Sequence, residues 1–375
     1  MNNSIHQLHQ LGQSLWYDNI DRRLLEDGTL QGMIDRGEIR GVTSNPSIFN
    51  KAIGQSSTYN EDIKTFTQAG LSREEIYERL AVADIQKAAD FFAPLFQDSG
   101  GGDGFVSLEV SPYLARDTEG TLEEARHLWE VVDRPNLMVK IPATREGLPA
   151  VRQATALGIN INITLIFSLA RYRKVMDAYL GGLEDRLEAG EDISGIHSVA
   201  SFFISRIETK VDDRLAALQE AGKMTGTEIK PLQGQAAVAS GKVAYQAYQQ
   251  VLGEANSRYG RLVEQGANRQ RVLWASTSTK NPRYSDVKYV EEMIGPETVN
   301  TVPQRTLEAF LDHGEAAITI DQGVEEAREA LQDLEEAGVD LEEVTRELEE
   351  EGVAAFAESF TALLETIQER KETLT

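Results

Sequence analysis

Met138-Val-Lys-Ile-Pro-Ala-Thr144 places Lys140 inside an apolar run that ends at a proline. The run is typical of a buried strand, and the proline predicts a turn directly after it. An ammonium group is unfavourable away from water, so a lysine held there tends to lose its proton and become an amine that attacks carbonyl groups. The alternative is a lysine that extends from a strand end to solvent. The heptapeptide alone leaves both interpretations open.

Short apolar, β-branched segments recur on both sides of this run. Eight of them are predicted strands: residues 15–18, 41–45, 105–110, 137–141, 159–167, 197–203, 272–276 and 299–303. Several are nearly continuous apolar runs, as expected for parallel strands buried on both faces. Helical periodicity occupies the intervals, including residues 72–96, 121–132, 169–189 and 236–258. This alternation indicates βαβ units, and eight of them favour a closed (β/α)8 TIM barrel of the α/β class over an open sheet.

Polar residues stand at the ends of several predicted strands, before the next helical pattern begins. They are Asp18, Thr43 to Asn45, Glu109, Lys140, Asn162, Thr164, Ser201 and Ser276 to Ser278. In a barrel these strand ends converge on the carboxyl-terminal mouth, where active sites of this fold are built. An open sheet would not gather all of them.

Three other stretches are expected to be peripheral. Residues 97–104 form a glycine-rich loop that lacks the Gly-Lys-Ser/Thr ending of a phosphate-binding P-loop, and residues 221–235 form a polar connection. Residues 321–375 are predicted to be an acidic helical extension that packs over the barrel or its mouth. We expect residues 1–375 to form a single barrel domain with this extension packed on it.

Composition restricts the classes of partner. The formal net charge of −24 argues against nucleic acid and anionic lipid as partners, although a local cluster of Arg and Lys can still bind a small phosphorylated molecule. The absence of cysteine excludes disulfides, thiolate metal sites and cysteine nucleophiles. No apolar stretch is long enough to span a membrane, and the first residues do not resemble a signal peptide, so we expect a cytoplasmic protein.

The histidines do not predict a metal site. They are His6, His9, His127, His197 and His313. None of these positions has the His-x-x-x-His spacing typical of zinc ligands, so surface or core roles are expected.

Four motifs occur in chain order, each at a predicted strand end. They are Gly41-Val-Thr-Ser-Asn-Pro-Ser47, Ser107-Leu-Glu-Val-Ser111, Val139-Lys-Ile-Pro-Ala-Thr144 and Asn160-Ile-Asn-Ile-Thr-Leu-Ile-Phe-Ser168. Together they resemble the transaldolase family, and the resemblance covers residues 15–303. The length, the acidic tail and the opening Leu15-Trp-Tyr-Asp-Asn-Ile-Asp-Arg22 are similar to the longer bacterial branch, including the transaldolase half of fusions with glucose-6-phosphate isomerase.

The resemblance implies a class I aldolase-like barrel that uses neither a metal nor an organic cofactor. Such an enzyme moves a dihydroxyacetone unit from a ketose phosphate such as sedoheptulose 7-phosphate to an aldose phosphate such as glyceraldehyde 3-phosphate. By motif match, Lys140 is the amine that forms the Schiff base. The resemblance leaves the oligomeric state open between a monomer and a homodimer.

Two carboxylates match the family's proton-transfer residues. Asp18 matches the base for the substrate C4 hydroxyl, and the nearby Asp21 is less favoured because it follows the predicted strand end; the structural alternative for either is a helix N-cap. Glu109 matches the glutamate that moves protons during imine formation, through a water that Thr164 helps to hold. The alternative for Glu109 is a plain ion pair with Lys140.

The remaining matches concern substrate binding. Asn45 and Asn162 match amides that orient sugar hydroxyls, and Thr43 and Ser44 are further candidates, although Thr-Ser-Asn-Pro-Ser is also typical of an ordinary turn.

Ser201-Phe-Phe-Ile-Ser-Arg206 matches a phosphate-binding segment, in which Phe202 replaces the family's usual proline. This match makes Arg206 the phosphate anchor and Ser201 a hydroxyl contact, whereas the structural alternative for Arg206 is a surface salt bridge. Lys280 occupies the place of a second basic residue and binds phosphate as a point charge.

Two other functions remain open. A fructose 6-phosphate aldolase shares the fold and the imine but lets water protonate the enamine; such enzymes resemble a shorter branch with a tyrosine where this chain has Glu109. A barrel that only binds sugar phosphates would be expected to lack catalytic residues, yet Asp18, Glu109 and Lys140 are all present.

Overall fold

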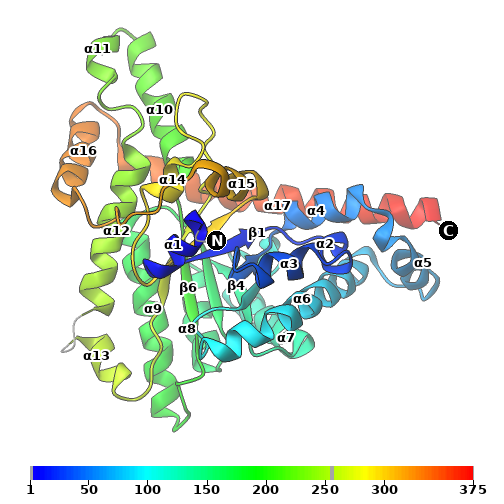
Figure 1. Cartoon of the computed structure of the whole chain (residues 1–375). Helices are drawn as coiled ribbons and strands as arrows, with labels where there is room; N and C mark the ends of the chain where they lie inside the picture. Colours follow the sequence, from blue (N-terminus) through cyan, green and yellow to red (C-terminus); the bar gives the residue numbers. More distant parts are fainter. Residues whose placement is uncertain (1–2, 254–256, 375) are drawn as a thin grey trace.

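The centre of the computed structural model, which describes residues 3–253 and 257–374, is a closed parallel barrel (Figure 1). In these residues eight strands follow one another around the barrel in chain order, and the last pairs with the first. The strands are β1 (Gln13–Asp18), β2 (Gly41–Thr43), β3 (Phe105–Glu109), β4 (Leu137–Pro142), β5 (Ile161–Ile166), β6 (Ser198–Phe203), β7 (Arg271–Ala275) and β8 (Thr298–Val302). The predicted (β/α)8 fold is therefore confirmed.

Each predicted strand is present, and its observed ends differ from the predicted ends by at most two residues. The largest shift at a carboxyl end is in β2, where predicted strand residues Ser44 and Asn45 lie outside the strand. At the substituted position in β6, Phe202 pairs in register with Trp274 of β7. The strand therefore continues through the site of the family's usual proline.

Helices connect successive strands and surround the barrel (Figure 1). From the N-terminus to β4 they are α1 (Ser4–Gln10), α2 (Arg22–Glu26), α3 (Thr29–Asp35), α4 (Pro46–Gln55), η1 (Ser57–Tyr59), α5 (Asn60–Gln68), α6 (Arg73–Asp98), η2 (Pro112–Leu114) and α7 (Thr118–Val132). After β4 they are α8 (Gly147–Ala156), α9 (Leu169–Glu188), α10 (Ser205–Glu220), α11 (Gly226–Ile229), α12 (Ala236–Leu252), α13 (Arg258–Val263), α14 (Lys288–Glu291), α15 (Gln304–His313), α16 (Val324–Glu336) and α17 (Leu341–Leu374).

Three helix predictions need correction. Helix α6 extends to Asp98, so the first two residues of the predicted glycine-rich loop are helical. Helix α11 lies within the predicted connection at 221–235. The helix predicted at 236–258 ends at Leu252 as α12, and residues 254–256 of that prediction lie outside the described residues.

Polar residues after β2 and β5 cap the next helix and so turn the chain at the carboxyl ends of these strands. Asn45 caps α4, whose first residue is Pro46, and Ser168 caps α9. Such residues accept hydrogen bonds from backbone amides that the helix cannot satisfy itself. Short connections of this kind keep the strand-end side chains close together at the mouth of the barrel.

The predicted C-terminal helical extension is present. Helix α16 packs against α12, whereas α17 packs along α4, α5, α6 and α10 and also contacts the strand β5. Figure 1 shows α17 (red) as one long helix that runs beside α4 toward the C-terminus. The extension therefore bridges helices from the first and second halves of the barrel.

None of the helices in the described residues combines the length and the apolar character needed to cross a membrane.

Candidate active site

A cavity of about 240 Å³ opens where the strands end. Of the predicted site residues, those that line this cavity are Asp18, Thr43, Asn45, Lys140, Thr164, Ser201, Arg206 and Lys280. The other three do not line it, but each contacts a residue that does. They are Ser44, Glu109 and Asn162.

Lys140 lies at the centre of this arrangement. In the barrel it pairs with Glu109 of β3 on one side and with Asn162 of β5 on the other. The lysine is only 6% exposed, so its side chain does not extend to solvent. Its Nζ donates a hydrogen bond to the Ser44 carbonyl oxygen at 2.8 Å. This hydrogen bond fixes the direction of the amine.

Glu109 is a buried carboxyl beside this amine. Its Oε2 lies 3.5 Å from Lys140 Nζ, and burial raises the pKa of Glu109 from 4.5 to about 7 although the lysine charge opposes the rise. In the described structure this Oε2 and the Thr164 hydroxyl oxygen are both buried without a hydrogen-bond partner. Buried polar atoms normally have partners, so both atoms are suited to hold a water molecule or a substrate group. Glu109 can therefore gain and lose a proton near neutral pH.

Asp18 is the second carboxyl, at the end of β1. Its Oδ1 accepts a hydrogen bond from Thr43 Oγ1 at 2.6 Å. Burial raises the pKa of Asp18, whereas this hydrogen bond and the charges of Lys140 and Lys280 oppose the rise. The alternative residue, Asp21, caps α2 by accepting from the Arg23 amide at 2.8 Å. Asp18 thus faces the cavity, and Asp21 has the structural role of a cap.

The polar residues around Lys140 differ in how they contribute. Asn45 Oδ1 accepts from the Ile48 amide at 3.0 Å and so caps α4, which leaves its amide nitrogen as the group that can contact a sugar hydroxyl. Asn162 is fully buried and accepts from Ser201 Oγ at 2.7 Å. Ser44 is fully buried and faces Lys140 through its carbonyl. Asn162 and Ser44 do not line the cavity themselves, but each contacts a residue that does.

Two cations line the cavity at Arg206 and Lys280. Within the described ranges the Arg206 side chain forms no ion pair or hydrogen bond, and its guanidinium carbon lies 5.4 Å from the centroid of the Phe203 ring. Lys280 Nζ donates to Ser278 Oγ at 2.7 Å. Burial and the Arg206 charge lower the pKa of Lys280, and burial lowers that of Arg206. The structural alternative for Arg206, a salt bridge, is absent from these residues. Arg206 and Lys280 together are suited to bind an anionic ligand.

Several lining residues were not predicted as site residues, including Phe203, Thr301 and Phe356. Thr301 Oγ1 lies 2.6 Å from Thr43 Oγ1. Because Thr301 is a polar residue near the end of β8, the expectation that such residues gather at the mouth of the barrel also applies to it. Phe356 belongs to α17, and its ring centroid lies 6.0 Å from Lys140 Nζ. No sequence pattern indicates which residue of a long helix lies above the lysine.

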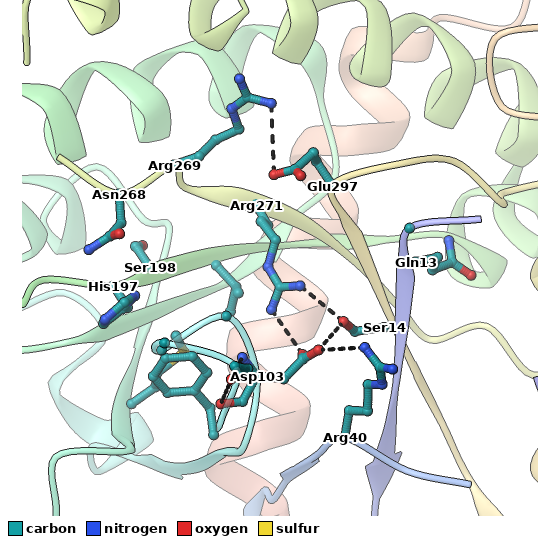
Figure 2. A pocket seen from close by; sticks show the side chains of 18 of the residues that line it. Gln13, Ser14, Arg40, Asp103, His197, Ser198, Asn268, Arg269, Arg271 and Glu297 are labelled. Carbon is teal, nitrogen blue, oxygen red and sulfur yellow. Dashed lines mark hydrogen bonds and ion pairs between the residues drawn. The ribbon is translucent and has the colours of Figure 1, made fainter. Parts of the chain in front are cut away.

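A second cavity, of about 380 Å³, lies among the first residues of the strands, at the opposite end of the barrel. Its cations face carboxylates (Figure 2): Arg40 and Arg271 lie 3.3 and 3.2 Å from Asp103, and Arg269 lies 3.8 Å from Glu297. Asp103 belongs to the glycine-rich loop, yet it is buried. Because these charges are paired, this end of the barrel is better suited to stability than to binding an anion.

The described residues contain no group of three or more His, Asp or Glu side chains placed to hold a metal ion. His127 lies 3.0 Å from Glu78, and His313 lies 2.9 Å from Asp286, both at the surface.

Fold and site together define an α/β barrel with a buried, carboxylate-flanked lysine at its mouth, an arrangement suited to Schiff-base chemistry. Residues 15–367 match the family model described as transaldolase/fructose-6-phosphate aldolase. A protein named transaldolase from Trichodesmium erythraeum is 42% identical over 379 residues, which cover 100% of this chain and 99% of that protein. Another, from Thermobifida fusca, is 46% identical over 371 residues, with 99% of each chain covered. The chain belongs to the transaldolase/fructose-6-phosphate aldolase family, which confirms the family that the motifs indicated.

We predict that Glu109 makes stability depend on pH. The unfolded chain releases this proton near pH 4.5, whereas the folded chain holds it to about pH 7, so the contribution of Glu109 to the free energy of unfolding falls between these values. Urea unfolding of the wild type and of Glu109→Gln at a series of pH values measures the contribution of Glu109 to the free energy of unfolding. The variant should gain stability relative to the wild type from about pH 4.5 to pH 7. Parallel pH curves would show that the carboxyl titrates normally.

Proposed function

We propose that this protein acts as a transaldolase through a Schiff base on Lys140. It moves a dihydroxyacetone unit from sedoheptulose 7-phosphate to glyceraldehyde 3-phosphate, which gives erythrose 4-phosphate and fructose 6-phosphate, in the non-oxidative pentose phosphate pathway. The observation that carries the proposal is the buried Lys140 amine, 3.5 Å from Glu109, in a cavity that is also lined by Asp18 and by the cations Arg206 and Lys280. Family membership and full-length relatives named transaldolase support transfer as the activity.

Imine formation uses Lys140 and Glu109. The neutral amine adds to the ketose carbonyl at C2, and the resulting carbinolamine must lose its hydroxyl group as water. Glu109 supplies the proton for that departure and takes one back on hydrolysis, which its raised pKa suits. The unpartnered Thr164 hydroxyl supports a role in holding the water that carries the proton. The ion pair between Glu109 and Lys140 is compatible with this role.

Carbon–carbon cleavage uses Asp18. As a carboxylate it removes the proton from the C4 hydroxyl, and the C3–C4 bond breaks with its electron pair moving into the protonated imine. The product is a neutral enamine on Lys140, so no bare carbanion forms and no metal or organic cofactor is required. An acceptor aldehyde then receives the pair, and Asp18 returns its proton to the new hydroxyl. The Thr43 hydrogen bond keeps the carboxylate oriented.

The substrate is held by its phosphate at one end and its hydroxyls at the other. Arg206 and Lys280 supply positive charge for the phosphate, and Ser201 adds a hydroxyl. Asn45 and Thr43 face the part of the sugar next to Lys140. Asn162 and Ser44 act indirectly, by orienting Ser201 and the lysine.

The proposal includes the organisation of the protein. We propose one domain for residues 1–375, with residues 321–375 as a helical extension, which the packing of α17 on α4 and α10 supports. A cytoplasmic location is proposed because the chain lacks cysteine and acts on sugar phosphates. The oligomeric state, monomer or homodimer, stays a prediction.

We predict that fructose 6-phosphate and erythrose 4-phosphate yield sedoheptulose 7-phosphate and glyceraldehyde 3-phosphate without added metal. Asp18→Asn should still form the imine but lose about 10²–10⁴-fold in turnover, because it lacks the base for the C4 hydroxyl. The products can be followed by mass spectrometry after overnight EDTA, with Asp21→Asn as the matched control of near wild-type rate. Loss of activity that zinc restores would point to a metal-dependent aldolase.

Arg206→Ala should weaken binding of phosphorylated sugars selectively. A charge-assisted contact contributes about 1.5–3 kcal/mol, so the KM for fructose 6-phosphate should rise roughly 10- to 150-fold while that for fructose changes little. Lys280→Arg should be tolerated or should lower this KM, because arginine offers a bidentate contact. Arg173→Ala, at an exposed arginine outside the cavity, is the control. Equal effects on both sugars would remove Arg206 from the phosphate pocket.

A further inference from the structure

Phe356 lies above the reacting amine, although the proposed mechanism assigns it no step. It lines the cavity with its ring centroid 6.0 Å from Lys140 Nζ, and it comes from α17 in the C-terminal extension, which is not part of the barrel. The ring is half-buried and packs against the hydrophobic core. A large apolar side chain at the open end of a polar cavity excludes water from the groups beneath it.

One helical turn before Phe356, α17 is held close to the end of β5. Gly352 is buried there, and a Cβ atom at this position would lie 3.0 Å from Leu165 Cδ2 and 3.6 Å from Phe167 Cε2. Leu165 has a φ of 59° within a stretch where the pairing of β5 with β6 shifts register. Such irregularities redirect side chains near active sites. The small residue and the irregular strand end together let the helix approach the mouth closely.

One turn after Phe356, the helix is held by an aromatic cluster. The Phe360 ring centroid lies 5.3 Å from those of both Tyr77 and Tyr113, in edge-to-face contacts. Residues four apart lie on one face of a helix, so Gly352, Phe356 and Phe360 all face the barrel. Phe356 is therefore fixed between two anchors.

Ion pairs hold the N-terminal part of α17 in the same position. Glu347 lies 2.7 Å from Lys210 and 2.6 Å from Arg214, both on α10, and Glu349 lies 2.9 Å from Arg171 on α9. Part of the acidity of the extension is thus used to attach it to the barrel helices beside the phosphate-binding cations. A surface pair of this kind contributes little alone, but a set of pairs together fixes an orientation.

The fate of the enamine depends on whether water can reach it. If an acceptor aldehyde reaches the enamine first, C3 forms a new carbon–carbon bond and the reaction is a transfer. If water donates a proton to C3 instead, hydroxide remains, and hydrolysis of the resulting imine releases dihydroxyacetone and free Lys140. That second outcome is a net cleavage of the ketose phosphate. The family description covers both activities, so membership alone does not decide between them.

We propose that Phe356 is a specificity-determining residue that keeps water from the enamine on Lys140 and thereby favours transfer over release of dihydroxyacetone. This inference rests on the proposed function. The side chain acts by covering the reacting carbon, and Gly352 and Phe360 position it. The C-terminal extension is then part of the active site.

The test is the ratio of two rates measured with fructose 6-phosphate as donor. Dihydroxyacetone release is measured without acceptor while glyceraldehyde 3-phosphate is removed enzymatically, and transfer is measured with erythrose 4-phosphate. Phe356→Ala should raise the ratio of release to transfer by roughly tenfold or more, because a water-accessible site lowers the barrier to protonation. Phe356→Leu, which keeps an apolar side chain of smaller size, should raise it less, and this second variant decides the question if the alanine variant is unstable.

Val353→Ala is the matched control, because it shortens another apolar side chain of α17 that packs against the core and does not line the catalytic cavity. Its ratio should equal that of the wild type. An unchanged ratio in both Phe356 variants would overturn the inference, and so would an equal rise in Val353→Ala, which would assign the effect to a loosened helix. Absence of transfer in the wild type would instead overturn the proposed function.

Discussion

The structure depends on one buried contact, between the Lys140 amine and the Ser44 carbonyl, with the Glu109 carboxyl beside it. A buried amine and a buried carboxyl are each unfavourable unless they are paired or lose their charge. The parallel register of β3, β4 and β5 sets Glu109, Lys140 and Asn162 side by side, so the barrel itself enforces the pairing. The raised pKa of Glu109 follows from this burial.

The charged side chains at the two ends of the barrel have different surroundings. At the amino end the arginines face Asp103 and Glu297, and the network is complete within the protein. At the carboxyl end Arg206 and Lys280 both line the cavity, and burial together with the Arg206 charge lowers the pKa of Lys280. An incomplete network is costly for stability, and its location at the mouth indicates that a ligand completes it.

Much of this arrangement follows from the sequence. Continuous apolar runs with helical intervals predict the barrel, and polar strand ends predict which residues meet at the mouth, because eight parallel strands all point the same way. The sequence does not show which of these residues reach the cavity: Ser44 follows β2 and Asn162 is the second residue of β5, and neither lines it. The position of Phe356 could not be predicted, since it depends on the close approach at Gly352 and the irregular end of β5. Those are products of tertiary packing and leave no periodic signal.

The most direct test of the account is to identify the residue that carries the substrate. The protein is treated with borohydride in the presence of fructose 6-phosphate, which reduces the imine to a stable bond, and the adduct is located by peptide mapping. The account predicts a dihydroxyacetone-derived adduct on Lys140 alone, absent in Lys140→Ala. An adduct on another lysine, such as Lys51, Lys210 or Lys280, or no adduct in an active enzyme, would contradict it.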